Sequence, residues 1–182
     1  MITGTKRNIY TIGLITFIVS ACSIFYELLI AQTLSALASN TVLWYSLTVG
    51  LYLGSMGFGA FICAKLFKDS FTWPDLFKIE ILLSLAGGLA VPILHFTHTL
   101  YIFLSMQNLT AFASILLFLN FFLIVIVIGV LTGLELPLLI GLGNKQSAPA
   151  TVTNRILCID YTGSLAGALV FSLILLPKYE PL

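Results

Sequence analysis

The chain has 182 residues, of which 59% are hydrophobic and only 8% are charged, and its formal net charge is +1. Soluble globular domains carry about 25% charged residues, so this composition excludes a soluble domain and indicates an integral membrane protein. A net charge this small, without any run of Lys or Arg, also argues against nucleic acid as a partner.

Five apolar stretches are long enough to cross a bilayer, which takes about 20 helical residues for about 30 Å of hydrocarbon. The predicted spans lie near residues 9–37, 42–66, 76–98, 111–142 and 156–177. Unbroken runs of this length indicate helices, because strands of a membrane barrel would alternate with a period of two. The predicted fold class is therefore all-α: a polytopic bundle of about five transmembrane helices, forming a single domain over residues 1–182.

The first span follows the basic residues Lys6 and Arg7, a pattern that secretory signals share. Its apolar stretch is longer than the roughly 7–15 residues of a signal's apolar region, and Glu27 and Gln32 interrupt it. We therefore predict that the first helix is not cleaved.

Small residues recur at helical spacing in the second, fourth and fifth spans, which lets membrane helices approach closely. The glycines that we expect to pack helices together are Gly50, Gly54, Gly57, Gly163 and Gly167. A pore or a moving interface is the functional alternative to simple packing.

Basic residues are distributed unequally between the two sides of the predicted bundle. Seven of the eight fall on the side of the N-terminus and of the second and fourth connections: Lys6, Arg7, Lys65, Lys68, Lys78, Lys145 and Arg155. The other side has only Lys178. By the positive-inside rule, the N-terminus is expected in the cytoplasm and the C-terminus outside, in a multi-pass protein of the cell membrane.

The side chains that most often bind metals or form disulfides are scattered. Cys22, Cys63 and Cys158 fall in three different spans without paired spacing, which predicts neither a disulfide nor a zinc site. His95 and His98 are expected near the outer surface as interfacial residues rather than metal ligands. The sequence thus predicts no metal and no cofactor.

Four carboxylates interrupt the predicted spans: Glu27, Glu80, Glu135 and Asp160. A charge at mid-bilayer costs about 2.5–3.5 kcal/mol on insertion scales, so these side chains should point inward. Three of them, all but Glu27, lie within roughly 15 Å of a cytoplasmic helix end at 1.5 Å per residue, and we expect them to form a cation-attracting vestibule. In the alternative, each acid pairs with a nearby base, such as Lys78 or Arg155, or accepts helix-end hydrogen bonds.

The segment "GLELPLLIG", residues 133–141, combines Gly133, Glu135 and Pro137. Proline has no N–H for the carbonyl of Gly133 and is expected to break or kink the helix. Such an irregular polar spot is tolerated in a membrane only where it is buried in protein or lines a cavity.

Three segments resemble the membrane domain of bacterial transmembrane spermidine synthase-like proteins: "ACSIFYELLIAQTLSALASNTVLWYSLTVGLYLGSMGFGA" at 21–60, "GLELPLL" at 133–139 and "DYTGSLAGALVFSLILLP" at 160–177. In that family, several N-terminal helices precede a soluble polyamine aminopropyltransferase domain of Rossmann-like fold. The resemblance implies that Glu27, Glu135 and Asp160 are family positions, and that the bilayer is a bacterial inner membrane.

The chain departs from this family in one respect, because the catalytic domain is expected to be missing. No glycine-rich strand-to-helix fingerprint is present. No Ser-His-Asp, Cys-His or metal-ligand arrangement replaces it. We therefore expect no enzymatic activity from the chain by itself; fused or partnered, it would belong to a polyamine aminopropyltransferase.

Three functions follow as hypotheses. The first is a noncatalytic membrane module that anchors or supplies an aminopropyltransferase domain or subunit. The second is a small transporter or channel for polyamines or other cations. The third is a structural assembly subunit. The expected partners are the lipid bilayer, a soluble aminopropyltransferase, a polyamine ligand and further copies of the chain.

Overall fold

The computed structural model describes residues 2–37, 41–67, 72–145 and 149–179, and all its regular elements are helices. The long helices are α1 (Ile2–Leu37), α2 (Thr41–Phe67), α3 (Trp73–Met106), α4 (Thr110–Asn144) and α5 (Pro149–Val170). A π-helical turn, η1 (Phe171–Leu175), and the short α6 (Leu176–Tyr179) continue α5. The predicted all-α class is confirmed.

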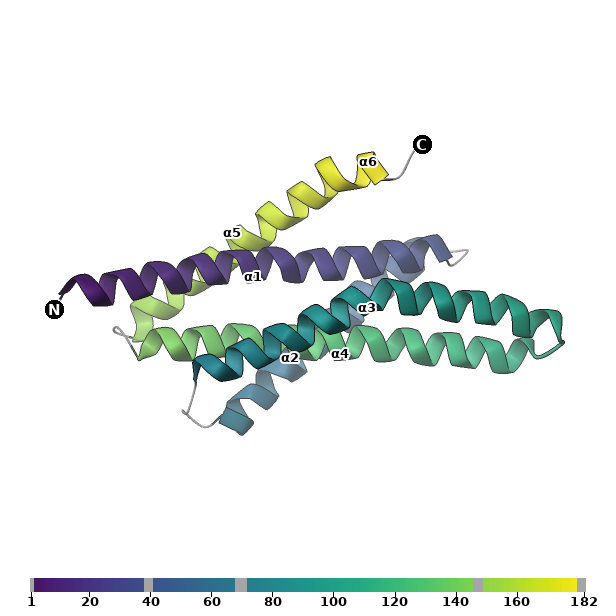
Figure 1. The fold of residues 1–182 in the computed structure, drawn as a ribbon, viewed down its shortest axis with the longest axis horizontal. Helices are drawn as coiled ribbons and strands as arrows, with labels where there is room; N and C mark the ends of the chain where they lie inside the picture. Colours follow the sequence, from purple (N-terminus) through teal and green to yellow (C-terminus); the bar gives the residue numbers. More distant parts are fainter. Residues whose placement is uncertain (1, 38–40, 68–71, 146–148, 180–182) are drawn as a thin grey trace.

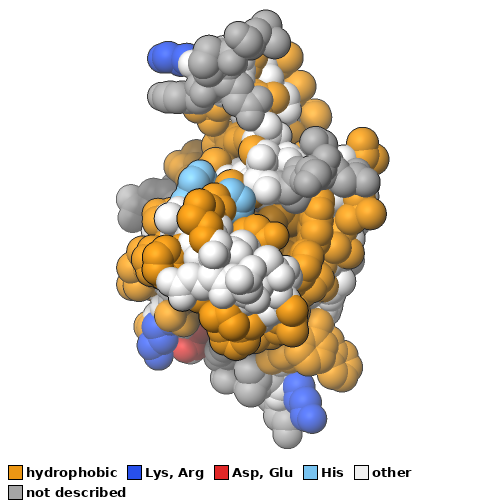
Figure 2. Space-filling view, turned by 90° about the vertical axis from the view of Figure 1, so that its right-hand side faces the viewer, with side chains coloured by type: hydrophobic (Ala, Val, Ile, Leu, Met, Phe, Trp, Pro, Cys, Tyr) orange, Lys and Arg blue, Asp and Glu red, His pale blue; other side chains and the backbone are white. Residues whose placement is uncertain are grey.

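Among the described residues, five stretches are long and apolar enough to cross a membrane: residues 10–37, 42–65, 73–106, 110–144 and 151–178. Successive helices run in opposite directions, so the start of α1, the end of α2 with the start of α3, and the end of α4 with the start of α5 lie at one end (Figure 1). Bulky apolar side chains face outward on each of the five long helices, among them Leu14, Phe58, Phe96, Leu119 and Leu165. Figure 2 looks at the bundle from the end opposite the start of α1 and shows hydrophobic side chains over much of the described surface, with few charged ones.

The orientation of the termini stays a prediction. Lys68 and the side chains of Lys6 and Arg7 lie outside the described part of the chain.

The third helix extends beyond its predicted end at residue 98 and finishes at Met106. Apolar residues continue past His98, and the chain turns only where Asn108 adopts a left-handed conformation with φ 61°. The N–H of Leu109 then donates to the carbonyl of Leu104 at 3.2 Å, a hydrogen bond typical of helix ends with a left-handed residue. Both histidines therefore lie within α3.

Helix α4 is the centre of the bundle and packs mainly against α2 and α3, while α5 packs mainly against α1. The apolar core forms two clusters. The larger side chains of one are Ile12, Leu76, Leu138, Leu139 and Ile156. Those of the other are Ile30, Leu83, Leu94, Phe121 and Ile128.

Glycines place two pairs of helices in backbone contact. A Cβ added to Gly133 of α4 would lie 2.0 Å from the carbonyl oxygen of Met56 on α2. A Cβ on Gly163 of α5 would lie 2.6 Å from the carbonyl oxygen of Phe17 on α1. Gly167, one turn further, approaches α1 in the same way. Helices α2 and α4 thus form one close pair, and α1 and α5 another.

The predicted packing role of Gly50, Gly54 and Gly57 needs correction. A Cβ on any of the three would have no heavy atom within 4 Å. Helix α2 instead turns the face that carries Gly59 toward α4, where an added Cβ would lie 2.2 Å from the carbonyl oxygen of Val130. The other three glycines lie on the opposite side of α2, because a helix turns by about 100° per residue.

Candidate functional site

Helix α1 carries a buried polar stripe. Thr16, Ser20, Ser23 and Glu27 are at most 8% exposed. Their spacing of four, three and four residues places them on one face of the helix. Thr16 Oγ1 donates to the carbonyl of Ile12 at 2.9 Å, and Ser20 Oγ donates to that of Thr16 at 2.8 Å. Such bonds satisfy hydroxyl groups in apolar surroundings.

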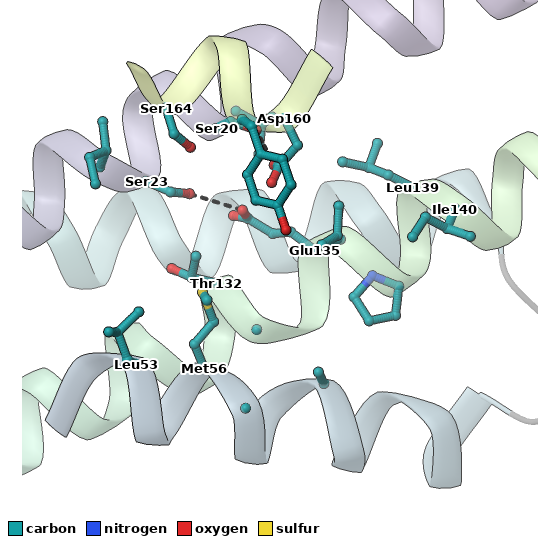
Figure 3. A pocket seen from close by; sticks show the side chains of 18 of the residues that line it. Ser20, Ser23, Leu53, Met56, Thr132, Glu135, Leu139, Ile140, Asp160 and Ser164 are labelled. Carbon is teal, nitrogen blue, oxygen red and sulfur yellow. Dashed lines mark hydrogen bonds between the residues drawn. The ribbon is translucent and has the colours of Figure 1, made fainter. Parts of the chain in front are cut away.

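Glu135 of α4 meets this stripe and is only 4% exposed. Ser23 Oγ donates a hydrogen bond to its Oε2 at 3.0 Å (Figure 3). The other oxygen, Oε1, is buried and has no hydrogen-bond partner in the described part of the chain. A buried charged group that lacks a partner carries a large desolvation cost. Half of this carboxylate is therefore unsatisfied.

Asp160 brings α5 to the same stripe. Ser20 Oγ donates to Oδ1 of Asp160, in addition to its contact with the carbonyl of Thr16. A hydroxyl group has a single proton to donate, so Ser20 serves only one of these two acceptors at a time.

A pocket of ≈ 640 Å³ opens between the α1–α5 pair and the α2–α4 pair. Glu27, Glu135 and Asp160 all line it. Its apolar wall includes Leu53 and Met56, which lie across from the serines and acids in Figure 3. The pocket thus combines three carboxylates with a hydrocarbon surface.

A second polar contact joins the helices of the α2–α4 pair beside this pocket. The hydroxyl of Tyr52 on α2 donates to Thr132 Oγ1 on α4 at 2.9 Å. Both residues are buried and line the pocket. This bond fixes the rotation of α2 relative to α4, and so helps to aim Glu135 toward α1.

Of the three acids that were expected to form one vestibule, Glu135 and Asp160 line the same pocket and Glu80 does not. Glu80 lines a different pocket, with Cys22 and Tyr26. Glu80 nevertheless lies close enough to Glu135 for the two carboxylates to repel each other electrostatically. The third acid that lines the pocket of Glu135 and Asp160 is Glu27.

The bases suggested as partners for the acids are engaged elsewhere. Lys78 Nζ lies 3.8 Å from Oδ1 of Asp75. The guanidinium carbon of Arg155 lies 5.3 Å from the centre of the Tyr10 ring, in cation–π geometry. In the described part of the chain, none of the four membrane carboxylates forms a salt bridge.

The predicted helix break at Gly133 and Pro137 also needs correction, because α4 runs as one helix through both residues. Pro137 still removes the N–H donor that the carbonyl of Gly133 would receive in an ordinary helix. Both residues line the pocket. The helix therefore continues, but it lacks one backbone hydrogen bond beside the pocket.

Sequence reasoning missed five hydroxyl residues that shape the site: Thr16, Ser20, Ser23, Tyr52 and Thr132. A usable signal existed for the first three, since they stand in helical register with Glu27. The Tyr52–Thr132 contact joins residues that are 80 positions apart. No local pattern indicates such a contact.

Known proteins with similar sequences are named polyamine aminopropyltransferases. The one from Leptospira interrogans is 35% identical over 161 residues, which is 88% of this chain and 29% of that protein. Polyamine aminopropyltransferase 2 of Ralstonia nicotianae is 32% identical over 91% of this chain and 30% of its own length. Polyamine aminopropyltransferase 1 of Streptomyces coelicolor is 31% identical over 98% of this chain and 31% of its own length.

The chain is a relative of one part of the polyamine aminopropyltransferases. The resemblance stated in the sequence analysis is therefore confirmed. The chain spans about 30% of the length of these aminopropyltransferases. No protein-family model and no solved structure matches it.

Proposed function

We propose that the chain is a noncatalytic membrane module of the polyamine aminopropyltransferase type, which anchors an aminopropyltransferase to the bilayer or supplies it there. The observation that carries this proposal is the match of about nine-tenths of the chain to part of proteins with that name. Five helices of membrane length support an anchoring role. The bilayer is the cell membrane, in a bacterium the inner membrane.

The partner, a soluble aminopropyltransferase domain or subunit, binds at the cytoplasmic face. Described basic side chains gather at one end of the bundle, where Lys65 lies in the last turn of α2, Lys78 near the start of α3 and Arg155 near the start of α5. The positive-inside rule assigns that end to the cytoplasm.

Co-purification from membranes tests this proposal. The tagged chain, expressed in its own cells, is solubilised in mild detergent and captured, and aminopropyl transfer to putrescine is measured in the captured fraction. We expect activity that co-elutes with the chain. An unrelated five-helix membrane protein carrying the same tag is the control. Capture of no more activity than this control would contradict the proposal.

A second candidate function is favoured by the three carboxylates that line the pocket: passage of polyamines or other cations. Its test is uptake of labelled putrescine into proteoliposomes. Transport requires uptake above that of empty liposomes and a clear fall in the Glu135→Gln variant. Equal uptake by the two proteins would count against transport. A change in stability without any uptake would favour a structural assembly subunit.

A further inference from the structure

The strongest unexplained feature of the molecule is the free oxygen of Glu135. This side chain is 4% exposed and lines the pocket. Its Oε1 accepts no hydrogen bond in the described part of the chain. Keeping a carboxylate oxygen buried and unpaired is costly, and a positively charged donor in the pocket would remove that cost.

Further acceptors belong to residues that line the same pocket. Glu27, at 8% exposed, has no hydrogen bond within the described residues and lines the same pocket. The carbonyl of Gly133 lacks its helix donor because residue 137 is proline. These acceptors lack donors within the described residues, so the pocket suits a ligand rich in N–H groups.

The spacing of the acids selects the shape of that ligand. Asp160 meets α1 at Ser20 and Glu135 meets it at Ser23, while Glu27 lies one turn further. These levels spread over about 10 Å of the helix axis at 1.5 Å per residue. Among the described residues, no group of three or more His, Cys, Asp and Glu side chains could hold a metal ion. A ligand that reaches two of these acids must therefore be elongated.

Much of the remaining wall of the pocket is hydrocarbon. Leu53, Met56, Leu139 and Ile140 line it together with the acids. Apolar walls favour methylene groups, whereas each ammonium group brings three N–H donors for carboxylate and carbonyl oxygens.

We propose that this pocket binds a linear aliphatic diamine or polyamine, with one ammonium group on Glu135 and the second on Glu27. Ser23 acts as a positioning residue, because its hydrogen bond to Oε2 leaves Oε1 as the free acceptor for the ligand. The methylene chain lies against Leu53 and Met56. The inference rests on the proposed function for the membrane setting of the pocket.

Binding of radiolabelled putrescine to the full chain in lipid nanodiscs tests this proposal. We expect saturable binding that excess unlabelled putrescine displaces. We expect 1-aminobutane to compete at least tenfold more weakly, because it has one ammonium group, and 1,4-butanediol not to compete. Absence of saturable binding, or equal competition by all three compounds, would overturn the proposal.

Two pairs of variants locate the site. Glu135→Gln should weaken putrescine binding at least tenfold, about 1.4 kcal/mol. The matched control Asp75→Asn removes a carboxylate in the first turn of α3, outside the pocket lining, and should leave binding unchanged. Equal effects of the two substitutions would mean that the ligand does not sit at Glu135.

The second pair keeps the test valid if the loss of Glu135 disturbs folding. Gly57 lines the pocket, and an added Cβ there meets no atom within 4 Å, so Gly57→Leu narrows the pocket without a backbone clash. Gly50 is equally free but lies two turns away, outside the pocket lining. We expect Gly57→Leu to weaken binding and Gly50→Leu not to. The same affinity in both variants would overturn the location.

Failure of this inference and failure of the proposed function are distinguishable. If the chain captures aminopropyltransferase activity but binds no putrescine in nanodiscs, the pocket assignment is wrong and the module remains. If putrescine binds at Glu135 but no activity is captured, the pocket assignment holds and the anchoring role is wrong.

Discussion

The contact between α2 and α4 leads to a sharp prediction about stability. In a Gly133→Ala variant, the new Cβ would lie 2.0 Å from the carbonyl oxygen of Met56 and 2.8 Å from its carbonyl carbon. Real Cβ atoms essentially never come within 3.0 Å of such atoms, so the separation must grow by about 1 Å. The obstacle is backbone, and no side-chain rotation can relieve it.

The expected cost follows from this displacement. A gap of about 0.5–1 Å already loses a quarter to a half of the dispersion energy of each contact, and overpacking commonly costs about 1–3 kcal/mol. Because α2 and α4 share a long contact, we expect Gly133→Ala to lower the free energy of unfolding by about 3 kcal/mol or more. Gly54→Ala, in open space on α2, should raise it by about 0.5–1 kcal/mol, because alanine favours the helix.

Unfolding in mixed micelles, with SDS as the denaturant and helix content as the readout, measures both variants against the unmodified chain. If Gly133→Ala proved as stable as Gly54→Ala, the close approach of α2 and α4 would be refuted.

Two further predictions concern the serine stripe and the membrane orientation. Ser23→Ala removes the donor to Oε2 of Glu135 and should lower the free energy of unfolding by about 1–3 kcal/mol in the same SDS titration. The control Ser114→Ala, at an exposed helix start, should lower it by under about 0.5 kcal/mol. Equal losses in the two variants would argue against the buried hydrogen bond. The orientation is tested in whole cells with a membrane-impermeant maleimide and a variant without other cysteines. The reagent should label Asn108→Cys but not Lys78→Cys, because the basic end of the bundle faces the cytoplasm. The reverse labelling pattern would show the opposite orientation.

The number and type of the helices could be predicted from the sequence because long apolar runs have few alternatives in a bilayer. Helix ends were harder to predict. Hydrophobicity continues smoothly past residue 98, and the turn is set by the left-handed conformation of Asn108. Composition does not encode that local choice.

The inward placement of Glu135 was predictable from the cost of exposing a charge to lipid. The set of acids that share one pocket could not be predicted, because it depends on how each helix is rotated about its axis. Soluble helices reveal that rotation by an apolar stripe, but a membrane helix is apolar all round. The rotation of α2 is set by Gly59 and by the Tyr52–Thr132 bond, both recognisable only after the helices are packed.

The glycine contacts also determine which parts of the bundle can yield. The backbones are in close contact in the α2–α4 pair and in the α1–α5 pair, so the two helices of each pair cannot easily shift relative to each other. Each pair should therefore behave as a stiff unit, and relative motion should concentrate at the seam between the units. That seam is where the three carboxylates lie, so a small rocking of the two units would widen or narrow the space around them without unfolding any helix.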